Sequence, residues 1–492
     1  MKPAKVLLFV YAVFAILFLL AVVYPDEGLD LGCCKFDFAK PHDIFSLPEK
    51  KELKAEIKEE LKDADKLIKE ASNDIVEDTS NAEITGQIIS QDTVVAADTA
   101  KKVEASELKK NIVPIQFKDE KDRKNFWRFF SKALRSKHDV LRVLYYGDSQ
   151  IEADRITSFL RYKLQRLFGG YGPGMVPPVN FVSFFSLKQW NDDSWHRYSI
   201  MQYKKNGVYH GRYGILAGFA DYDTSSSIGE HTLIFEKANH SYSNTKKFDE
   251  MTMFYGLDSG DVVLKVFADG NLLDFTSLKP NDLGVYKLAL PSGTEKVELK
   301  FSGNGKPDIY AVSFDAKHGV AVDNIAIRGC SGTFFTKLDR RHFSKFFDKI
   351  KVGLVVLEFG GNVMPYMKDE KDCESYGRYF SSQLSLLRRI LKGIPILVVG
   401  PADMSVKQNG NFVTYPLLSK VRDEMRKAAF ANGVGFWDMY EAMGGENSMP
   451  AWVDAGLATT DYTHFTSKGA VVIANMLNNA IMNEFYTYKS SK

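Results

Sequence analysis

Residues 140–150 read Val-Leu-Arg-Val-Leu-Tyr-Tyr-Gly-Asp-Ser-Gln, a largely apolar run that ends in a glycine and three polar residues. The apolar part predicts a buried β-strand over residues 140–146. Directly after it, residues 153–168 predict a helix, because leucine and isoleucine recur at helical spacing there. A strand that leads straight into a helix is the basic unit of an α/β fold. Ser149 is therefore expected at the carboxyl end of a strand, where ligand sites of such folds usually lie.

The C-terminal part of the chain repeats this alternation. Continuous apolar runs predict strands over 352–359, 394–399 and 434–437, as expected for parallel strands that are covered on both faces. Helical periodicity predicts helices over 376–391, 417–431 and 467–485, and a further helix carries residues 126–130. We therefore expect an α/β fold, with a parallel sheet between two layers of helices, formed by residues 113–180 and 319–492.

The middle of the chain, residues 181–318, has little helical periodicity. Short runs typical of strands occur instead, separated by turn signals such as Asp269-Gly270-Asn271 and Ser292-Gly293. The runs cover residues 232–235, 251–255, 262–267, 285–290 and 296–301. This pattern predicts an all-β sandwich that interrupts the α/β fold.

The N-terminus carries the clearest compositional signal. Lys2 and Lys5 precede an uncharged apolar run from Val6 to Tyr24, which as a helix would span about 28 Å. A cleaved signal peptide and an uncleaved transmembrane anchor over residues 1–25 both fit. We favour the anchor, because no small-residue cleavage site follows. The flanking charges would then place the bulk of the chain outside the cytoplasm, in the periplasm or beyond, held at the inner membrane.

Residues 26–112 are predicted to be a spacer. Residues 50–70 are rich in Lys, Glu, Leu and Ala, which favours an exposed helix, and a partner-binding coiled coil remains an alternative. Residues 71–99 are polar and acidic, which favours a flexible linker.

Charge and cysteine content exclude other classes of protein. The formal net charge is only +2 over 492 residues, too small an excess to indicate binding to nucleic acid. None of the four cysteines has metal-ligand spacing, so no metal site is predicted. A disulfide between Cys330 and Cys373 remains open.

Three further motifs follow the same design as Ser149. Residues 324–333 form a strand that runs into a glycine turn ending at Gly332, and residues 358–362 lead from a strand through glycines to Asn362. Asp461 and His464 stand three residues apart, just before the last predicted helix. A serine hydroxyl becomes a good nucleophile only beside a base, an imidazole can take its proton, and a carboxylate fixes the tautomer of the imidazole.

These four motifs, in this order, resemble the SGNH (GDSL-type) hydrolase family over roughly residues 138–180 and 320–485. The resemblance implies that Ser149 is the nucleophile, His464 the general base and Asp461 the residue that orients it. It also implies an oxyanion hole built from the backbone N–H groups of Ser149 and Gly332 and the side chain of Asn362. The implied fold is the flavodoxin-like three-layer sheet, and no cofactor is required.

The inserted β module makes the chain similar to one branch of that family, the bacterial peptidoglycan O-acetylesterases. Ser149 and Gly332 are separated far more widely than the ~30 residues of a simple strand-helix-strand step. The resemblance implies removal of O-acetyl groups from an extracytoplasmic polysaccharide, with the insert acting like a carbohydrate-binding module. An O-acetyltransferase, working with a membrane O-acyltransferase as partner, and a non-catalytic polysaccharide-binding protein are the alternatives. Several aromatic residues could stack on sugars or pack the core instead: Trp190, Trp195, Tyr198, Tyr209 and Tyr213.

Overall fold

The computed structural model describes residues 29–30, 35–36, 112–203, 208, 210–224 and 229–492. The predicted anchor over residues 1–25 and nearly all of the predicted spacer lie outside these residues. Among the helices that are described, none is both long and apolar enough to cross a bilayer. Two short strands near the N-terminus, β1 (Leu29–Asp30) and β2 (Lys35–Phe36), pair with each other.

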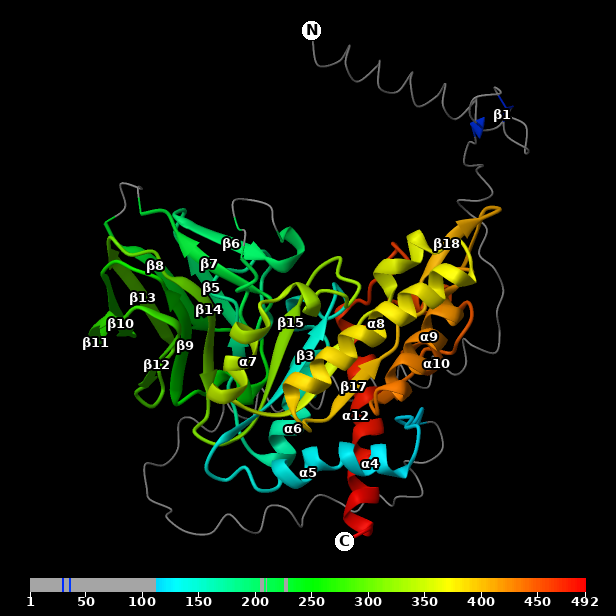
Figure 1. Cartoon of the computed structure of the whole chain (residues 1–492), viewed down its shortest axis with the longest axis horizontal. Coiled ribbons are helices and arrows are strands. Elements are labelled where there is room, and N and C mark those ends of the chain that lie inside the picture. Colours follow the sequence, from blue (N-terminus) through cyan, green and yellow to red (C-terminus); the bar gives the residue numbers. More distant parts are fainter. Residues whose placement is uncertain (1–28, 31–34, 37–111, 204–207, 209, 225–228) are drawn as a thin grey trace.

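A five-stranded parallel sheet, in the order β15-β3-β16-β17-β20, forms the centre of the larger unit (Figure 1). Helices cover both faces, so the strands are buried and their sequences read as continuous apolar runs. The register aligns Gly147, Ala326 and Glu358 as the last residues of three neighbouring strands. Their carboxyl ends therefore form one edge. The strands are β3 (Val140–Gly147), β15 (Gly319–Ala326), β16 (Lys351–Glu358), β17 (Ile396–Val399) and β20 (Gly435–Trp437).

The helices form two layers, one on each face of this sheet. One layer packs through the core that contains Phe126, Phe159 and Phe485, and the other through the core that contains Phe346, Phe380 and Met425. The first layer consists of α4 (Glu120–Phe126), α5 (Arg128–Ala133), α6 (Thr157–Phe168) and α12 (Ser467–Ser490). The second consists of α7 (Arg340–Lys349), α8 (Glu370–Leu391) and α9 (Leu418–Ala431). The expected three-layer α/β architecture is confirmed.

Two helix boundaries differ from those expected. The helix predicted over 153–168 begins only at Thr157, because Ala153 and Asp154 have φ angles of 62° and 65°. These left-handed conformations cannot be part of a right-handed helix. Residues 126–130 are divided between α4 and α5, which meet at Trp127.

The middle of the chain folds as two antiparallel sheets, in the orders β11-β10-β13-β8-β5 and β12-β9-β14-β7-β6. Their facing sides share one apolar core, as in a sandwich. β4 (Gly174–Val176) precedes residue 181 but pairs with β14, so the sandwich takes a strand from the segment that was expected to belong to the α/β unit. The other strands are β5 (Leu187–Asn191), β6 (Trp195–Ser199), β7 (Gly218–Tyr222), β8 (His231–Lys237), β9 (Glu250–Leu257), β10 (Val262–Ala268), β11 (Asn271–Leu278), β12 (Asn281–Ala289), β13 (Lys296–Gly303) and β14 (Asp308–Asp315).

The chain enters and leaves the sandwich at neighbouring points. The N–H of Val320 donates to the carbonyl of Gly169 at 2.9 Å. Gly170 and Gly319 both have φ of 99°, and a Cβ on Gly319 would lie 2.3 Å from the backbone nitrogen of Gly170. Only glycine permits this close crossing of two backbone segments.

Arg142, in the middle of β3, connects the two units. Its buried guanidinium forms an ion pair with Asp323 of β15 at 2.8 Å and another with Asp315, the last residue of β14. Asp323 also accepts the N–H of Met175 in β4 at 2.7 Å. A charge inside an otherwise apolar strand is thus balanced by one carboxylate from each unit.

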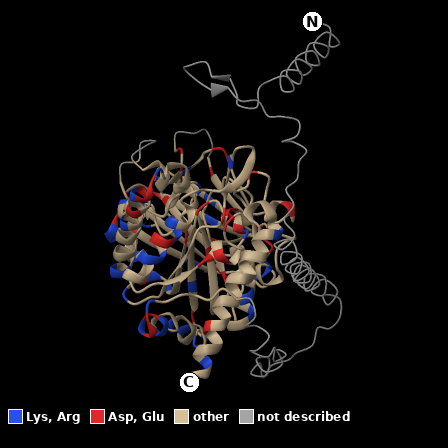
Figure 2. Ribbon diagram, turned by 90° about the vertical axis from the view of Figure 1, so that its right-hand side faces the viewer, with Lys and Arg blue, Asp and Glu red and all other residues tan. Residues whose placement is uncertain are grey.

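Charges of both signs are distributed over the molecule. Figure 2 shows Lys and Arg intermixed with Asp and Glu along the visible ribbon, without a large area of one sign. This agrees with the formal net charge of +2.

Candidate active site

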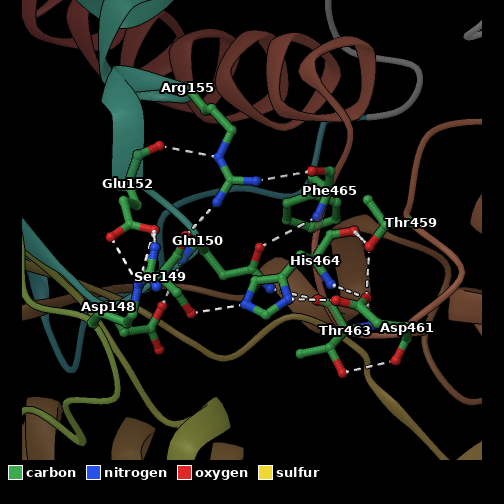
Figure 3. Close-up of polar contacts among 11 residues, drawn as sticks. Asp148, Ser149, Gln150, Glu152, Arg155, Thr459, Asp461, Thr463, His464 and Phe465 are labelled. Carbon is green, nitrogen blue, oxygen red and sulfur yellow. Dashed lines mark hydrogen bonds and ion pairs between the residues drawn. The ribbon is translucent and has the colours of Figure 1, made fainter. Parts of the chain in front are cut away.

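Ser149 lies directly after β3, at the carboxyl edge of the parallel sheet, and faces the loop that precedes α12. Its Oγ is 2.8 Å from Nε2 of His464, and Nδ1 of the same ring is 2.7 Å from Oδ2 of Asp461 (Figure 3). The structure therefore brings all three predicted catalytic side chains into one chain of hydrogen bonds. With the Nδ1 proton held by the carboxylate, Nε2 is free to accept the proton of the serine hydroxyl.

Asp461 is held as an anion by its surroundings. Partial burial alone would raise its pKa, but hydrogen bonds from the Thr459 hydroxyl and from the backbone and ring of His464 lower the pKa well below its usual range. The N–H of Thr463 adds a further bond at 2.9 Å. Asp461 is therefore ionised at neutral pH, and it can balance the positive charge of a protonated His464.

Two residues that the sequence did not single out join the serine turn to the histidine loop. Arg155 donates to the carbonyls of Glu152 and Phe465 at 3.0 and 3.1 Å and also to the carbonyl of Ser149. Gln150 donates from its side-chain amide to the carbonyl of Thr463 at 2.6 Å. Figure 3 shows both side chains lying between the two segments. The distance between Ser149 and His464 therefore also depends on Arg155 and Gln150, whose side chains connect the turn after β3 to the loop before α12.

The turn that follows Ser149 is strained and is held by a buried polar network. Asp154, with its left-handed backbone, pairs with the fully buried guanidinium of Arg161 through contacts of 2.6 and 2.9 Å. Asp154 also accepts the hydroxyl of Thr157, which in turn accepts the amide of Asn324 on β15 at 2.7 Å. Non-glycine residues with positive φ cost free energy, so such a network is needed to keep the turn in this form.

Asp148 organises the other side of the serine turn. Its carboxylate accepts the N–H of Gln150 at 2.9 Å and the side-chain amide of Asn362 at 2.8 Å. Burial raises its pKa to about 6, and these two bonds and the nearby His464 limit the rise. Both contacts are structural, as expected for a residue that shapes the loop.

The turn that was expected to supply one donor of the oxyanion hole contains two glycines, Gly329 and Gly332. Gly332 does not line the pocket beside Ser149, because its N–H points to Sγ of Cys330 at 3.3 Å and its Cα packs on Phe359. Gly329, three residues earlier in the same turn, does line the pocket. Within the described residues, the N–H groups of Ser149 and Gly329 have no acceptor in the protein. Gly329 is therefore a second candidate donor beside the predicted Gly332.

Asn362 lies in the pocket as predicted, but its amide group is already engaged. Nδ2 donates to Asp148 and, at 3.1 Å, to the carbonyl of Cys330. An amide has only two hydrogens. Asn362 can therefore donate to a bound oxyanion only if the longer bond to Cys330 is exchanged for it.

The pocket itself has a volume of about 320 Å³. Polar groups occupy the side of Ser149 and His464, and an apolar wall lies opposite. That wall consists of Phe359, Pro365, Tyr366, Pro401, Ala402, Met404 and Met439. Such a cavity suits a small acyl group attached to a larger molecule that remains partly outside.

Other predicted features have clear places in the structure. Cys330 and Cys373 are both free thiols, so the possible disulfide between them is absent. Among the described residues, no three His, Cys, Asp or Glu side chains are arranged to hold a metal ion. Of the aromatic residues considered for sugar binding, Trp195 and Tyr213 are core residues, Tyr198 stacks on Phe219, and Tyr209 lies outside the described residues. Trp190 is exposed.

Residues 292–472 match the model of the GDSL-like lipase/acylhydrolase family. The match begins in the sandwich and ends in α12, so it includes Asp461 and His464 but not Ser149, which only the fold brings to them. No curated protein sequence matches the chain.

Among solved structures, a peptidoglycan O-acetylesterase superposes with a TM-score of 0.61 at 21% identity, over 76% of this chain and 99% of the other. This likeness shows a shared fold. A match to 76% of this chain is too long to be confined to the α/β unit, so it also includes residues of the inserted sandwich. A salicylyl-acyltransferase from a tetracycline biosynthetic pathway (TM-score 0.29, 14% identity, 63% of this chain and 96% of the other) is also similar. So is a family two carbohydrate esterase from Clostridium thermocellum in complex with cellohexaose (TM-score 0.24, 13% identity, 56% and 98%). The last two scores are too low to bear on function.

Proposed function

Because residues 292–472 match the model of the GDSL-like lipase/acylhydrolase family, we propose that this chain is a serine hydrolase that removes O-acetyl groups from a polysaccharide outside the cytoplasm. The observation that carries the proposal is the hydrogen-bonded chain Ser149–His464–Asp461 at the wall of a pocket. The fold shared with a peptidoglycan O-acetylesterase supports a cell-wall or surface glycan as the acylated molecule.

The proposed reaction proceeds in two steps. In the first, Nε2 of His464 takes the proton of Ser149 while Oγ attacks the ester carbonyl carbon, and the carbonyl oxygen becomes an oxyanion. The N–H groups of Ser149 and Gly329 and the amide of Asn362 stabilise this charge. His464 then returns the proton to the departing sugar hydroxyl, which leaves the acetyl group on Ser149.

In the second step, water attacks the acyl-enzyme. His464 takes a proton from that water, the tetrahedral intermediate collapses, and acetate leaves as Ser149 regains its proton. Asp461 keeps the imidazole in the correct tautomer and balances its charge in both steps.

Hydrolysis of p-nitrophenyl acetate and release of acetate from O-acetylated peptidoglycan by the full-length protein test this function. Ser149→Ala and His464→Ala are each expected to lower kcat by at least about 10³-fold, because the members of a triad act as a unit. Wild-type rates in either variant would exclude the mechanism. If acetyl groups reach an added deacetylated glycan faster than they appear as free acetate, the protein is an O-acetyltransferase instead.

The location outside the cytoplasm rests on the sequence alone. The apolar run Val6–Tyr24, with Lys2 and Lys5 before it, supports an anchor whose N-terminus is inside. A fusion of alkaline phosphatase to the C-terminus should be active in intact cells and should remain with the membrane fraction. An inactive fusion would overturn this part of the proposal.

A further inference from the structure

Exposed aromatic rings also occur at the pocket, in the α/β unit. The aromatic residues that the sequence suggested for sugar binding lie instead in the middle part of the chain, residues 190–213. Tyr366, the last residue of the short helix η6 (Gly361–Tyr366), is 73% exposed and lines the pocket. Among the described residues it makes no hydrogen bond and no ring contact. The helix begins directly before Asn362, so the ring is carried on the same rigid segment as a side chain of the candidate oxyanion hole.

A second aromatic surface lies beside the catalytic histidine. The rings of Phe412 and Tyr462 are stacked, with centroids 3.6 Å apart and planes at 9°. Phe412 belongs to the hairpin formed by β18 (Ser405–Gln408) and β19 (Asn411–Thr414), and 37% of it is exposed. The N–H of Ser405 donates to the carbonyl of Tyr462 at 3.0 Å, which fastens the hairpin to the loop of His464.

The two surfaces lie at the same pocket. Tyr366 lines it directly, and the second surface adjoins it, because Met404 and Thr463 line the pocket and are the chain neighbours of Ser405 and Tyr462. Tyr462 has a φ of 55°, an unusual conformation for a bulky residue that costs free energy and that is commonest at functional sites.

Flat exposed rings next to an acyl pocket match the shape of a glycan. A pyranose presents an apolar face of C–H groups that can lie on an aromatic ring, while its hydroxyls at the edge remain in water or bind polar groups. A lipid or a free short-chain ester has no such flat units beyond its acyl group, and it would leave both rings exposed.

We propose that Tyr366 and the Phe412–Tyr462 stack are a glycan-binding site, in which each surface holds a sugar ring adjacent to the acylated one. This proposal rests on the proposed function, because it assumes that Ser149 attacks an ester on a sugar. It assigns recognition of the polysaccharide to the rim of the pocket in the α/β unit, in addition to any contact with the sandwich.

Kinetics on two substrates test the site: p-nitrophenyl acetate, which has no sugar, and a six-sugar fragment of O-acetylated peptidoglycan. Tyr366→Ala is expected to raise KM for the fragment by about 5- to 10-fold, a clearly larger rise than for p-nitrophenyl acetate, which meets only the acyl pocket that Tyr366 also lines. Tyr366→Phe keeps the ring and should behave as wild type. The control Tyr379→Ala removes a tyrosine of similar kind, 47% exposed on α8 and away from the pocket, and should change neither substrate.

The other surface needs a variant that keeps the hairpin packed. Phe412→Leu retains apolar contact with Tyr462 but removes the flat face, so it should raise KM for the fragment without affecting p-nitrophenyl acetate. A fall in kcat for p-nitrophenyl acetate would show that the stack only supports the loop of His464 and would overturn its assignment. Unchanged KM for the fragment in both Tyr366→Ala and Phe412→Leu would overturn the whole site. Failure of the proposed function is distinct, since the wild-type protein would then release no acetate from the fragment.

Discussion

Glu358 is a buried carboxyl group that the proposed reaction does not use. It is the last residue of β16, accepts the hydroxyl of Tyr145 at 2.5 Å, and its other oxygen has no partner among the described residues. Burial raises its pKa to about 8, and nearby Asp148 contributes, while the bond from Tyr145 opposes the rise. The group is therefore uncharged in the folded protein at neutral pH.

Glu358→Gln should change how stability depends on pH. Below about pH 4.5, Glu358 carries its proton in both the folded and the unfolded chain. Between about pH 4.5 and about pH 8, the unfolded chain loses this proton while the folded chain keeps it, so rising pH lowers the free energy of unfolding of the wild type. The variant lacks this loss, which amounts to at most about 1.4 kcal/mol for each pH unit. The difference in melting temperature, Glu358→Gln minus wild type, should thus be larger at pH 8 than at pH 5. An identical difference at the two pH values would show that Glu358 is not protonated in the folded state.

Asn362→Ala tests the oxyanion hole. Loss of one donor typically lowers kcat by about 10²- to 10³-fold, and KM for p-nitrophenyl acetate should change little. Asn432→Ala is a suitable control, because that amide binds Ser381 and Ala428 outside the pocket. If kcat is unchanged in Asn362→Ala, the bonds to Asp148 and Cys330 are the whole role of Asn362.

The sequence could identify which residues form this site more readily than where their N–H groups and side chains point. Ser149, Asn362, Asp461 and His464 are recognisable because each motif has a distinctive order of residues. Gly329 and Gly332 lie in one turn, and only the backbone angles decide which N–H is free and which meets a sulfur atom. Arg155 could not be recognised, because its function depends on three carbonyl groups that the fold brings together.

At the scale of the elements, apolar runs predicted the parallel strands well, since burial on both faces leaves few polar positions. The start of α6 could not be predicted, because Ala153 and Asp154 are ordinary helix residues that the network around Arg161 holds in left-handed conformations. The pairing of β4 with the sandwich was also hidden: three residues carry too little periodicity to assign a strand to a sheet.

Arg142→Ala tests the connection between β3 and the sandwich. Removal of the guanidinium leaves Asp315 and Asp323 buried without their cation, which should lower the free energy of unfolding by about 3–5 kcal/mol. Arg212→Ala is the matched control, because its pair with the exposed Asp258 should be worth at most about 1 kcal/mol. Urea unfolding followed by tryptophan fluorescence measures both. Similar losses in the two variants would contradict the structural role of Arg142.

At the scale of the whole molecule, residues 113–116 are bonded to the edge strand β20 of the parallel sheet. The carbonyl of Val113 accepts the indole N–H of Trp437, and Gln116 exchanges two backbone hydrogen bonds with Phe436 of β20. A chain of residues 112–492 should therefore keep wild-type kcat/KM on p-nitrophenyl acetate. A chain that begins at residue 119 loses these bonds and the buried Ile115, and it should melt at a lower temperature. Equal melting temperatures would show that the segment before α4 adds no stability.

The order of synthesis has a consequence for how the molecule assembles. β3 is an inner strand, second in the order of its sheet, and it is made before the other four, yet both of its partners, β15 and β16, emerge only after the entire sandwich. The sandwich uses strands from residues 174–315 alone, so it can fold while β3 still waits unpaired. In the growing chain the sandwich can therefore be complete while β3 is still unpaired. The turn that carries Ser149 can make its full set of contacts only after β16 has been synthesised.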